Sequence, residues 1–434
     1  MSRYSQRLRA LRSNQFVANV FKLAGGSAMG QVLVVISTPF VTRIYPPAQM
    51  GLFGIFVAFL TFASVGATLR YDLAIVSTRD EREADILLMS ATAIAAPYVL
   101  VAIALLLLMI RFNFLGYEAL PRWSVFAMLV ALFGTGVFSA LRFWYVGRKR
   151  FGDISLAQIY QGAGRASLPL IVGAFSSAWG GLVCGEIAGR VFGGTKLIKG
   201  AWPEVRRTFS SLEPGESIRV LRKYWKYPAV FLPSSVLDAL ATSLPLPVIS
   251  ALFGIVAAGQ YFLVYRLATV PASLVSAGVA DVLHARLTDA AKSDKHSVHR
   301  IMRAATYRLL GVGLVIYLPA AAVSPFLFPI IFGASWKTAG VLMTIQSLAS
   351  ISGLVLTPLS RALNVSKHPE YKFLSDACRS AVPVAGLVFC HHFGLTFIRS
   401  MIVFCGLSVL SELFYLWIVW YATTPDRQIS FSAD

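Results

Sequence analysis

The sequence predicts an all-α polytopic membrane protein with about twelve transmembrane helices in two lobes of six. Of its 434 residues, 56% are hydrophobic and only 14% are charged, and the mean hydropathy is +0.68. A soluble protein of this size has about 25% charged residues. The deficit extends along the whole chain, so that apolar runs long enough to cross a bilayer recur from end to end. Backbone groups in lipid must be paired within each run, which makes the runs helices.

The first six predicted spans form an N-terminal lobe over residues 1–198. A basic segment, MSRYSQRLRALRSNQ, precedes the first apolar run. That run is too long for the core of a signal peptide and lacks an A-x-A cleavage site, so we expect a short basic surface helix and then a retained span. The spans are predicted at 17–42, 49–72, 84–110, 123–146, 154–177 and 180–198.

A C-terminal lobe over residues 227–434 is predicted to contain six more spans. They are expected at 227–252, 256–282, 304–331, 338–362, 373–391 and 395–421. The stretch between the lobes, 199–226, is basic and contains Pro and Gly, so we expect an amphipathic linker on the cytoplasmic surface.

Short segments match in order between the two halves. YPPAQMGLF (45–53) is similar to FGIVAAGQY (253–261), and LRFWYVGRK (141–149) is similar to SRALNVSKH (360–368). The second match aligns Arg142 with Arg361. Together the matches indicate a duplicated six-helix bundle whose two copies enclose a site.

The positive charge indicates topology. The formal net charge of +19 would suggest a nucleic-acid partner on a soluble protein. Here Lys and Arg are concentrated in alternate loops. If the N-terminus is cytoplasmic, only four of the 39 lie in outer loops, namely Arg43, Arg111, Arg122 and Lys337. The positive-inside rule then places both termini in the cytoplasm, requires an even number of spans and argues against nucleic acid as a partner.

The sequence contains no motif of a catalytic or cofactor site. GGTK (193–196) lacks the spacing of a phosphate-binding loop, and H-E-x-x-H and G-x-S-x-G motifs are absent. The four cysteines have no paired spacing. The predicted outer loops are too short for a folded catalytic domain. We therefore expect a protein that is not an enzyme, that uses no cofactor or metal, and whose spans perform its function.

Arg165, in the apolar segment IYQGAGRASLPLIVGAF (159–175), is the strongest candidate for a site residue. A charge at mid-bilayer costs about 3 kcal/mol on insertion scales, so it faces a bundle interior or a water-filled cavity. Arg165 lies roughly 20 Å along its helix from the basic RKR at 148–150, too far to reach that surface. Two interpretations stay open. Arg165 lines a cavity and binds an anion, or it pairs with Glu186, Asp238 or backbone carbonyls.

Seven further cations complete the predicted site. Arg70, Arg142 and Arg361 are near enough to the cytoplasmic interface to extend toward it, although the repeat would set Arg142 and Arg361 face to face across the site. Guanidinium groups are suited to bidentate binding of phosphate. The full set of candidate binding residues is Arg165, Arg70, Arg142, Arg266, Arg361, Lys22, Arg308 and Arg379.

Two carboxylates inside spans, Glu186 and Asp238, are candidates for coupling transport to an ion. A carboxylate in a low-dielectric cavity can exchange a proton or bind a cation. The alternative is that each carboxylate neutralises a nearby arginine.

Three motifs lie close together in residues 23–76: a Gly-rich first span, then TRxYxPxxxGxF, then LRYxxAI. They are present as Thr42-Arg43, Tyr45, Pro47, Gly51 and Phe53, followed by Leu69-Arg70-Tyr71-Asp72 and Ala74-Ile75. This region resembles the opening of Wzx-type flippases of polysaccharide and O-antigen repeat units, which are lipopolysaccharide biosynthesis proteins of the multidrug/oligosaccharidyl-lipid/polysaccharide (MOP) exporter superfamily. FGxxxxGxY at 253–261, WxxAG at 336–340 and LNVSKHPEY after the tenth span are similar to features of the same family.

The resemblance implies a MOP/MATE-like fold and a flippase function. Such proteins transfer undecaprenyl-pyrophosphate-linked oligosaccharides from the inner to the outer leaflet of the bacterial inner membrane, for O-antigen, capsule or exopolysaccharide synthesis. Two lobes alternate between inward- and outward-open states around a cationic cavity. Arg70 belongs to the LRY motif. The implied partners are the lipid-linked oligosaccharide, the bilayer, a polysaccharide polymerase and a chain-length regulator, and the expected state is a monomer.

Two other functions stay open. A cation-coupled exporter of drugs or small molecules on the same scaffold also has twelve spans, whereas the murein-precursor relative typically has fourteen. A membrane polysaccharide polymerase or ligase usually has a large outer loop, and none is predicted here. The many intramembrane arginines favour an anionic cargo over a drug.

Overall fold

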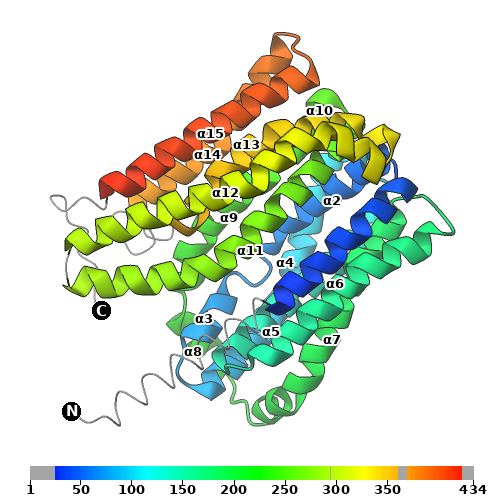
Figure 1. Ribbon diagram of the computed structural model, residues 1–434. Coiled ribbons are helices and arrows are strands. Elements are labelled where there is room, and N and C mark those ends of the chain that lie inside the picture. The colour runs from blue at the N-terminus through cyan, green and yellow to red at the C-terminus, as the bar shows by residue number, and fades with distance from the viewer. Residues whose placement is uncertain (1–24, 294, 360–368, 423–434) are drawn as a thin grey trace. The chain divides into compact units, whose positions relative to one another are not determined.

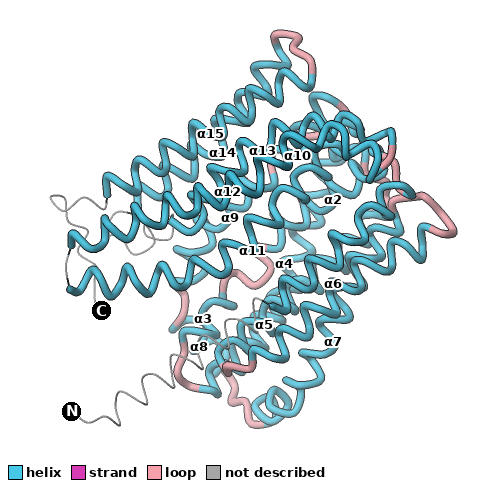
Figure 2. The backbone as a smooth tube through the Cα atoms, viewed as in Figure 1, coloured by secondary structure: helices cyan, strands magenta, loops and turns pink. Residues whose placement is uncertain are grey.

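The structure is a computed structural model that describes residues 25–293, 295–359 and 369–422. Within these ranges every regular element is a helix, and short loops join the helices (Figure 1, Figure 2). The prediction of an all-α fold is confirmed. Lys22 and Arg361 lie outside the described residues.

In the described part of the chain, twelve long helical segments follow one another. Eight are long and apolar enough to cross a membrane. They are Gly25–Ile44, α2 (Pro47–Ser64), α4 (Glu81–Arg111), α5 (Trp123–Gly147), the segment Tyr227–Phe253, α12 (Lys295–Phe332), α13 (Lys337–Leu359) and α15 (Phe397–Ala422).

Four other helices have spanning length but are less apolar. They are α6 (Phe151–Gly173), α7 (Gly180–Ser210), α11 (Ile255–Ser293) and α14 (Pro369–His392). Each contains a predicted intramembrane charge: Arg165, Glu186, Arg266 and Arg379, respectively. The chain is thus a multi-pass membrane protein, and the long segments agree in number with the predicted spans.

Two predicted spans are interrupted. The span predicted at 49–72 ends early, because α2 stops at Ser64 and a new helix, α3, begins at Tyr71 and ends at Ser77. Between them, Leu69 and Arg70 have φ angles of 47° and 62°, in the left-handed region that costs an L-residue about 1–2 kcal/mol. The span predicted at 227–252 consists of a π-helical turn (Tyr227–Phe231), α9 (Leu232–Ser243) and α10 (Pro245–Phe253).

The predicted linker at 199–226 is largely helical. α7 extends beyond residue 198 to Ser210, and a short amphipathic helix, α8, covers Glu216–Lys223. The α8 face that turns inward places Val220 in the protein core.

The described residues form two compact units. Unit 1 comprises residues up to Ile44, Phe59–Phe112 and Leu120–Val236, and unit 2 comprises Tyr45–Ala58, Asn113–Ala119 and residues from Leu237 onward. The division predicted at 199–226 stays a prediction.

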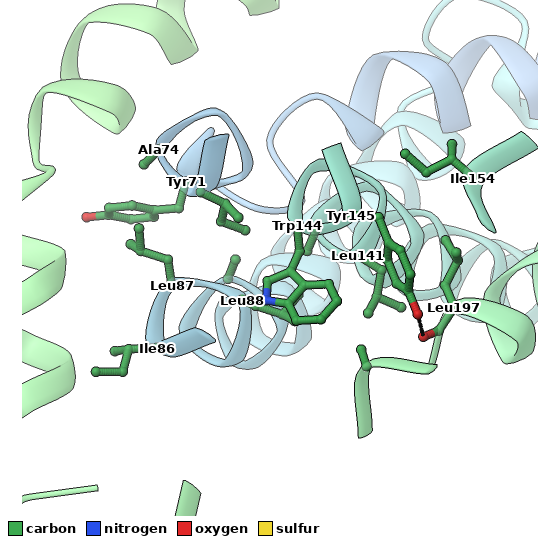
Figure 3. Packing of buried hydrophobic residues seen from close by; sticks show 14 of the residues in the cluster. Tyr71, Ala74, Ile86, Leu87, Leu88, Leu141, Trp144, Tyr145, Ile154 and Leu197 are labelled. Atoms are coloured by element: carbon green, nitrogen blue, oxygen red, sulfur yellow. Dashed lines mark hydrogen bonds between the residues drawn. The ribbon is translucent and has the colours of Figure 1, made fainter. Parts of the chain in front are cut away.

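The core of unit 1 lies between α3, α4, α5, α6 and α7 and contains two large aromatic side chains. Trp144 and Tyr145 are fully buried among aliphatic residues of these helices (Figure 3). Trp144 Nε1 donates a 2.7 Å hydrogen bond to Asp85, and Tyr145 Oη donates a 2.9 Å hydrogen bond to the Leu197 carbonyl. Both polar atoms of these aromatics are therefore satisfied, as burial requires.

Unit 2 brings the two halves of the first internal repeat together. A Cβ on Gly51 would collide with the Ile255 carbonyl of α11, and a Cβ on Gly259 would collide with the Pro47 carbonyl of α2. The glycines of YPPAQMGLF and FGIVAAGQY therefore allow two helix backbones to pack at close range. These motif residues have a packing role.

A buried glutamine joins the same region to the WxxAG turn. Gln260 Nε2 donates to the Ser335 carbonyl at 2.8 Å, and its Oε1 accepts from the Ala339 backbone at 2.9 Å. Trp336 is fully buried beside them. The motif at 253–261 thus holds the start of α13 in place, and with it the long helices of unit 2.

Candidate functional site

The first polar cluster of unit 1 depends on close packing of α6 and α7. Gly185, Gly189 and Gly193 recur every four residues and share one face of α7. A Cβ on Gly185 would contact the Pro169 ring at 2.6 Å, and a Cβ on Gly189 would contact Arg165 Cγ at 2.9 Å. The small residues therefore leave room for the Arg165 side chain to cross α7.

Arg165 reaches a carboxylate that it shares with a second arginine. Arg165 Nη2 donates a 2.8 Å hydrogen bond to Glu186 Oε1, and Arg190 Nη1 donates to the same oxygen. Arg190 Nε also donates to Thr135 Oγ1 of α5. Two guanidinium groups and one carboxylate leave this cluster with one net positive charge, which we call the arginine cluster (Arg165, Glu186, Arg190).

The two arginines differ in exposure. The Arg190 side chain is 11% exposed and the Glu186 side chain 10%, whereas Arg165 is 30% exposed. Among the described residues, Arg165 donates only through Nη2, and its buried Nε has no hydrogen-bond partner. Guanidinium has five N–H donors in a planar fork. Arg190 therefore neutralises Glu186, and Arg165 retains donors that can bind an anion.

This geometry supports the pairing interpretation of Arg165, and anion binding by this residue stays a prediction. The residue pairs with Glu186, one of the predicted partners, but the pairing is not one-to-one. Of the two roles predicted for Glu186, ion coupling or neutralisation of an arginine, the structure shows neutralisation, because Glu186 pairs with neighbouring arginines.

A second cluster in unit 1 surrounds Asp72 of α3. This buried carboxylate accepts hydrogen bonds from Ser139 Oγ at 2.9 Å and from the Leu73 amide at 3.0 Å. Arg142 on α5 lies close enough to interact electrostatically with Asp72. Arg70, which precedes α3, and Arg142 are half-buried, and the Nε atom of each is buried without a hydrogen-bond partner in the described part of the chain.

One face of α5 connects the two clusters. Thr135, Ser139 and Arg142 have i, i+4, i+7 spacing and therefore lie on one side of the helix, over roughly 10 Å of its length. Thr135 contacts the arginine cluster and Ser139 contacts Asp72. The polar strip of α5 thus connects two predicted cations of unit 1, Arg142 on the strip itself and Arg165 through the arginine cluster.

Unit 2 has a polar cavity of its own, about 260 Å³ in volume. Its lining includes Tyr265 of α11, Gln346 of α13, Arg379 of α14 and Glu412 of α15. Glu412 accepts a hydrogen bond from Ser352 and interacts electrostatically with Arg379. The cavity is large enough for several water molecules and holds one cation and one carboxylate.

The remaining predicted residues lie elsewhere. Asp238 on α9 is exposed, and its charge acts on Tyr265 and Tyr415 in unit 2. Arg266 on α11 is half-buried, and Arg308 on α12 is exposed. Within the described ranges, the His, Cys, Asp and Glu side chains form no group of three that could bind a metal ion.

Sequence reasoning missed Arg190, Thr135, Ser139 and Glu412. The i, i+4 spacing of Glu186 and Arg190 was a recognisable ion-pair pattern, and the spacing of Thr135, Ser139 and Arg142 was a recognisable polar strip. Glu412 had no such signature, because its partners come from helices distant in the sequence.

Long apolar helices, with ion pairs between them, define a multi-pass membrane protein. The chain belongs to the polysaccharide biosynthesis protein family, whose model matches residues 16–289. No curated protein matches the chain significantly by sequence.

Solved structures show the same fold at low sequence identity. A mutant form of the Vibrio cholerae MATE transporter VcmN is 15% identical over 96% of this chain and 99% of its own, with a TM-score of 0.59. The lipid II flippase MurJ in an inward closed conformation is 12% identical over 91% of this chain and 86% of its own, with a TM-score of 0.66. These matches confirm the MOP/MATE-like fold, and the relatives are transporters or flippases rather than enzymes.

Proposed function

We propose that the chain is a flippase that transfers undecaprenyl-pyrophosphate-linked oligosaccharide repeat units across the bacterial inner membrane for surface polysaccharide synthesis. The observation that supports this proposal most directly is the excess of guanidinium over carboxylate in the arginine cluster. A membrane protein retains an unneutralised cation among its spanning helices at a cost of about 3 kcal/mol. A diphosphate headgroup would compensate that charge when it binds, through charge-assisted hydrogen bonds.

The polar strip of α5 supports the same cargo. Arg70 and Arg142 supply two further guanidinium groups with unused Nε donors. Several guanidinium groups in fixed positions can bind successive phosphate oxygens of a pyrophosphate, whereas a single cation binds these oxygens less specifically. Alternating access of the two predicted lobes around a cationic cavity is the transport cycle that we propose.

The test is transfer of a lipid-linked oligosaccharide in cells that lack their own flippase, and in vesicles that contain the purified chain. Arg165→Ala should abolish transfer while the protein remains inserted, and Arg165→Lys should restore only part of it, because an ammonium group lacks the planar fork. Arg300→Ala, at an exposed position of α12, is the matched control and should transfer normally. Transfer by Arg165→Ala at the wild-type rate would refute the role of this residue, and failure of the wild-type chain with every plausible repeat unit would refute the function.

A cation-coupled drug exporter is the second candidate, because MATE transporters are among the structures of the same fold. The net positive charge of the arginine cluster opposes a cationic drug. Export of a cationic dye that competes with the lipid-linked oligosaccharide would favour the exporter, and we expect no such export.

Location, assembly and coupling follow from the same proposal. The distribution of Lys and Arg supports insertion in the inner membrane with both termini in the cytoplasm. We expect a monomer that passes its product to a polysaccharide polymerase and a chain-length regulator. Asp238 stays our coupling candidate from the sequence, and Glu412 joins it because it lies in the polar cavity of unit 2. Loss of ion-dependent transport in Asp238→Asn or Glu412→Gln would identify the coupling residue.

A further inference from the structure

The end of α7 extends beyond the hydrocarbon core. Its 31 residues span roughly 46 Å, compared with about 30 Å for the apolar part of a bilayer. Lys199, Arg206 and Arg207 lie in its last twelve residues. This charged end is therefore the one that leaves the membrane, and it does so at the depth of the lipid headgroups.

One face of this extension alternates cations with large aromatic side chains. Lys199, Trp202, Arg206 and Phe209 have 3, 4, 3 spacing and share one side of the helix. All four are exposed, and Trp202 and Phe209 are 59% and 68% exposed.

The helix that follows repeats the pattern. Ile218, Arg222 and Trp225 have 4, 3 spacing at and just beyond α8, and the two apolar residues are 58% and 57% exposed. We call these two groups together the basic aromatic face (Lys199, Trp202, Arg206, Phe209, Ile218, Arg222, Trp225).

On the opposite side of α8, ion pairs fix this helix to the rest of unit 1. Arg82 donates to both oxygens of Glu216, at 2.7 and 2.8 Å, and Lys223 Nζ donates to Glu83 at 2.6 Å. Tyr71 Oη adds a bond of 3.3 Å to the Leu221 carbonyl. α8 therefore presents its outer face in one orientation.

The cations of the basic aromatic face differ from those that hold α8 in place. Lys199, Arg206 and Arg222 form no salt bridge with any carboxylate of the described residues. Exposed tryptophan between unpaired cations is costly in water but favourable in a headgroup layer, where indole rings are amphipathic anchors and Lys and Arg meet anionic phosphate.

We propose that the basic aromatic face binds the headgroups of anionic phospholipids and so anchors unit 1 to one leaflet. Lipid is the partner that fits best, because α7 is long enough to cross the bilayer and to bring the face to headgroup depth. The cations complement the negative headgroup charge, and the aromatic rings insert between neighbouring acyl chains and glycerol groups. This anchoring is independent of the cargo.

The experiment measures lipid binding by the full-length chain in a neutral detergent, by native mass spectrometry during titration with phosphatidylglycerol or with phosphatidylcholine of the same chain length. The wild type should prefer phosphatidylglycerol. Since each cation near an anionic surface changes the association constant about fivefold, Arg206→Gln/Arg222→Gln should weaken phosphatidylglycerol binding by on the order of 25-fold. Arg206→Lys/Arg222→Lys should retain most of the preference.

The matched control removes the same charge from other exposed positions. Arg111→Gln/Arg122→Gln should change phosphatidylglycerol binding less than twofold. Equal losses in the two double variants would show that only net charge matters and would overturn the proposal, as would the absence of a preference in the wild type.

Two further arms complete the design. Inorganic phosphate at millimolar concentration should not displace the lipid, and displacement would indicate a free-phosphate site instead. Trp202→Ala/Trp225→Ala should weaken binding of both lipids, since the rings contact the part that the two lipids share. Unchanged binding in this variant would refute the anchoring role of the aromatics.

Discussion

Glu186 should be the most stability-critical member of the arginine cluster. Its Oε1 accepts hydrogen bonds from both Arg165 and Arg190, so Glu186→Ala leaves two guanidinium groups without a counter-charge. Removal of either arginine leaves the other pair intact. We therefore expect the largest loss of unfolding free energy for Glu186→Ala, a smaller loss for Arg190→Ala and the smallest for Arg165→Ala.

The magnitudes follow from distance and burial. At 2.8 Å and an effective dielectric constant of about 20, the gross Coulomb attraction is roughly 6 kcal/mol. Desolvation offsets part of this, and removal of one partner of a buried pair costs about 3–5 kcal/mol, which we assign to Glu186→Ala. Arg165 is 30% exposed and Arg190 only 11%, so truncation of Arg165 should cost about 1 kcal/mol and truncation of Arg190 about 2 kcal/mol.

The assay is reversible unfolding of the full chain by SDS titration in mixed micelles, with a double-mutant cycle between Glu186 and Arg190. The cycle should give a coupling energy of about 1–3 kcal/mol. Glu118→Ala, at an exposed glutamate in the short helical turn Tyr117–Ala119, is the control and should change stability by less than about 0.5 kcal/mol. The reasoning fails if Glu186→Ala matches this control, or if Arg165→Ala is the most costly of the three substitutions.

Three other perturbations test the packing and the linker. Gly259→Ala should destabilise unit 2 by about 1–3 kcal/mol through overpacking, whereas Gly311→Ala, which faces open space, should be neutral or slightly stabilising in the same assay. Hydrogen bonding from Arg82 lowers the pKa of Glu216 to about 2, so protection of α8 amides from exchange should be complete above the ordinary pKa of 4.5, decline as the pH falls further and be lost below about 2. In Glu216→Gln this dependence should be weaker, because only Glu83, whose pKa is lowered by the hydrogen bond from Lys223, then titrates against α8, and a wild-type-like profile in that variant would contradict the assignment. Tyr145→Phe should lose about 1 kcal/mol with the hydrogen bond to α7, and an unchanged midpoint would show that this bond contributes nothing.

Composition and periodicity were sufficient for the fold class, because the bilayer requires helices wherever the chain is apolar. They could not locate the break after Ser64. Leu69 and Arg70 adopt left-handed backbone angles that neither residue type favours, so tertiary contacts determine that turn. The residues of α2, the turn and the start of α3 are mostly apolar, so the sequence predicted one continuous span.

The candidate site was only partly accessible to sequence reasoning. Depth in the membrane singled out Arg165 correctly as a residue that needs a partner, and Glu186 was named as one. The Glu186–Arg190 pair is local to α7, but its contact with Arg165 depends on the rotation of α7 against α6, which the glycines at 185, 189 and 193 set by contact and not by hydropathy. The cavity around Glu412 is lined by six helices, α9, α10, α11, α13, α14 and α15, whose lining residues are separated by up to 171 positions in the chain, and no local pattern encodes such an assembly.

The arginine cluster also bears on how the chain enters the membrane during synthesis. α6 and α7 are not among the helices that are apolar enough to cross a membrane, and each contributes charged residues to the arginine cluster. With Arg165 and Arg190 bonded to Glu186, the two helices offer the translocation machinery a hairpin in which one carboxylate compensates part of the positive charge. The glycine contacts then act at the earliest stage of biogenesis, when the ribosome has completed the second arm and the pair can leave the protein-conducting channel together.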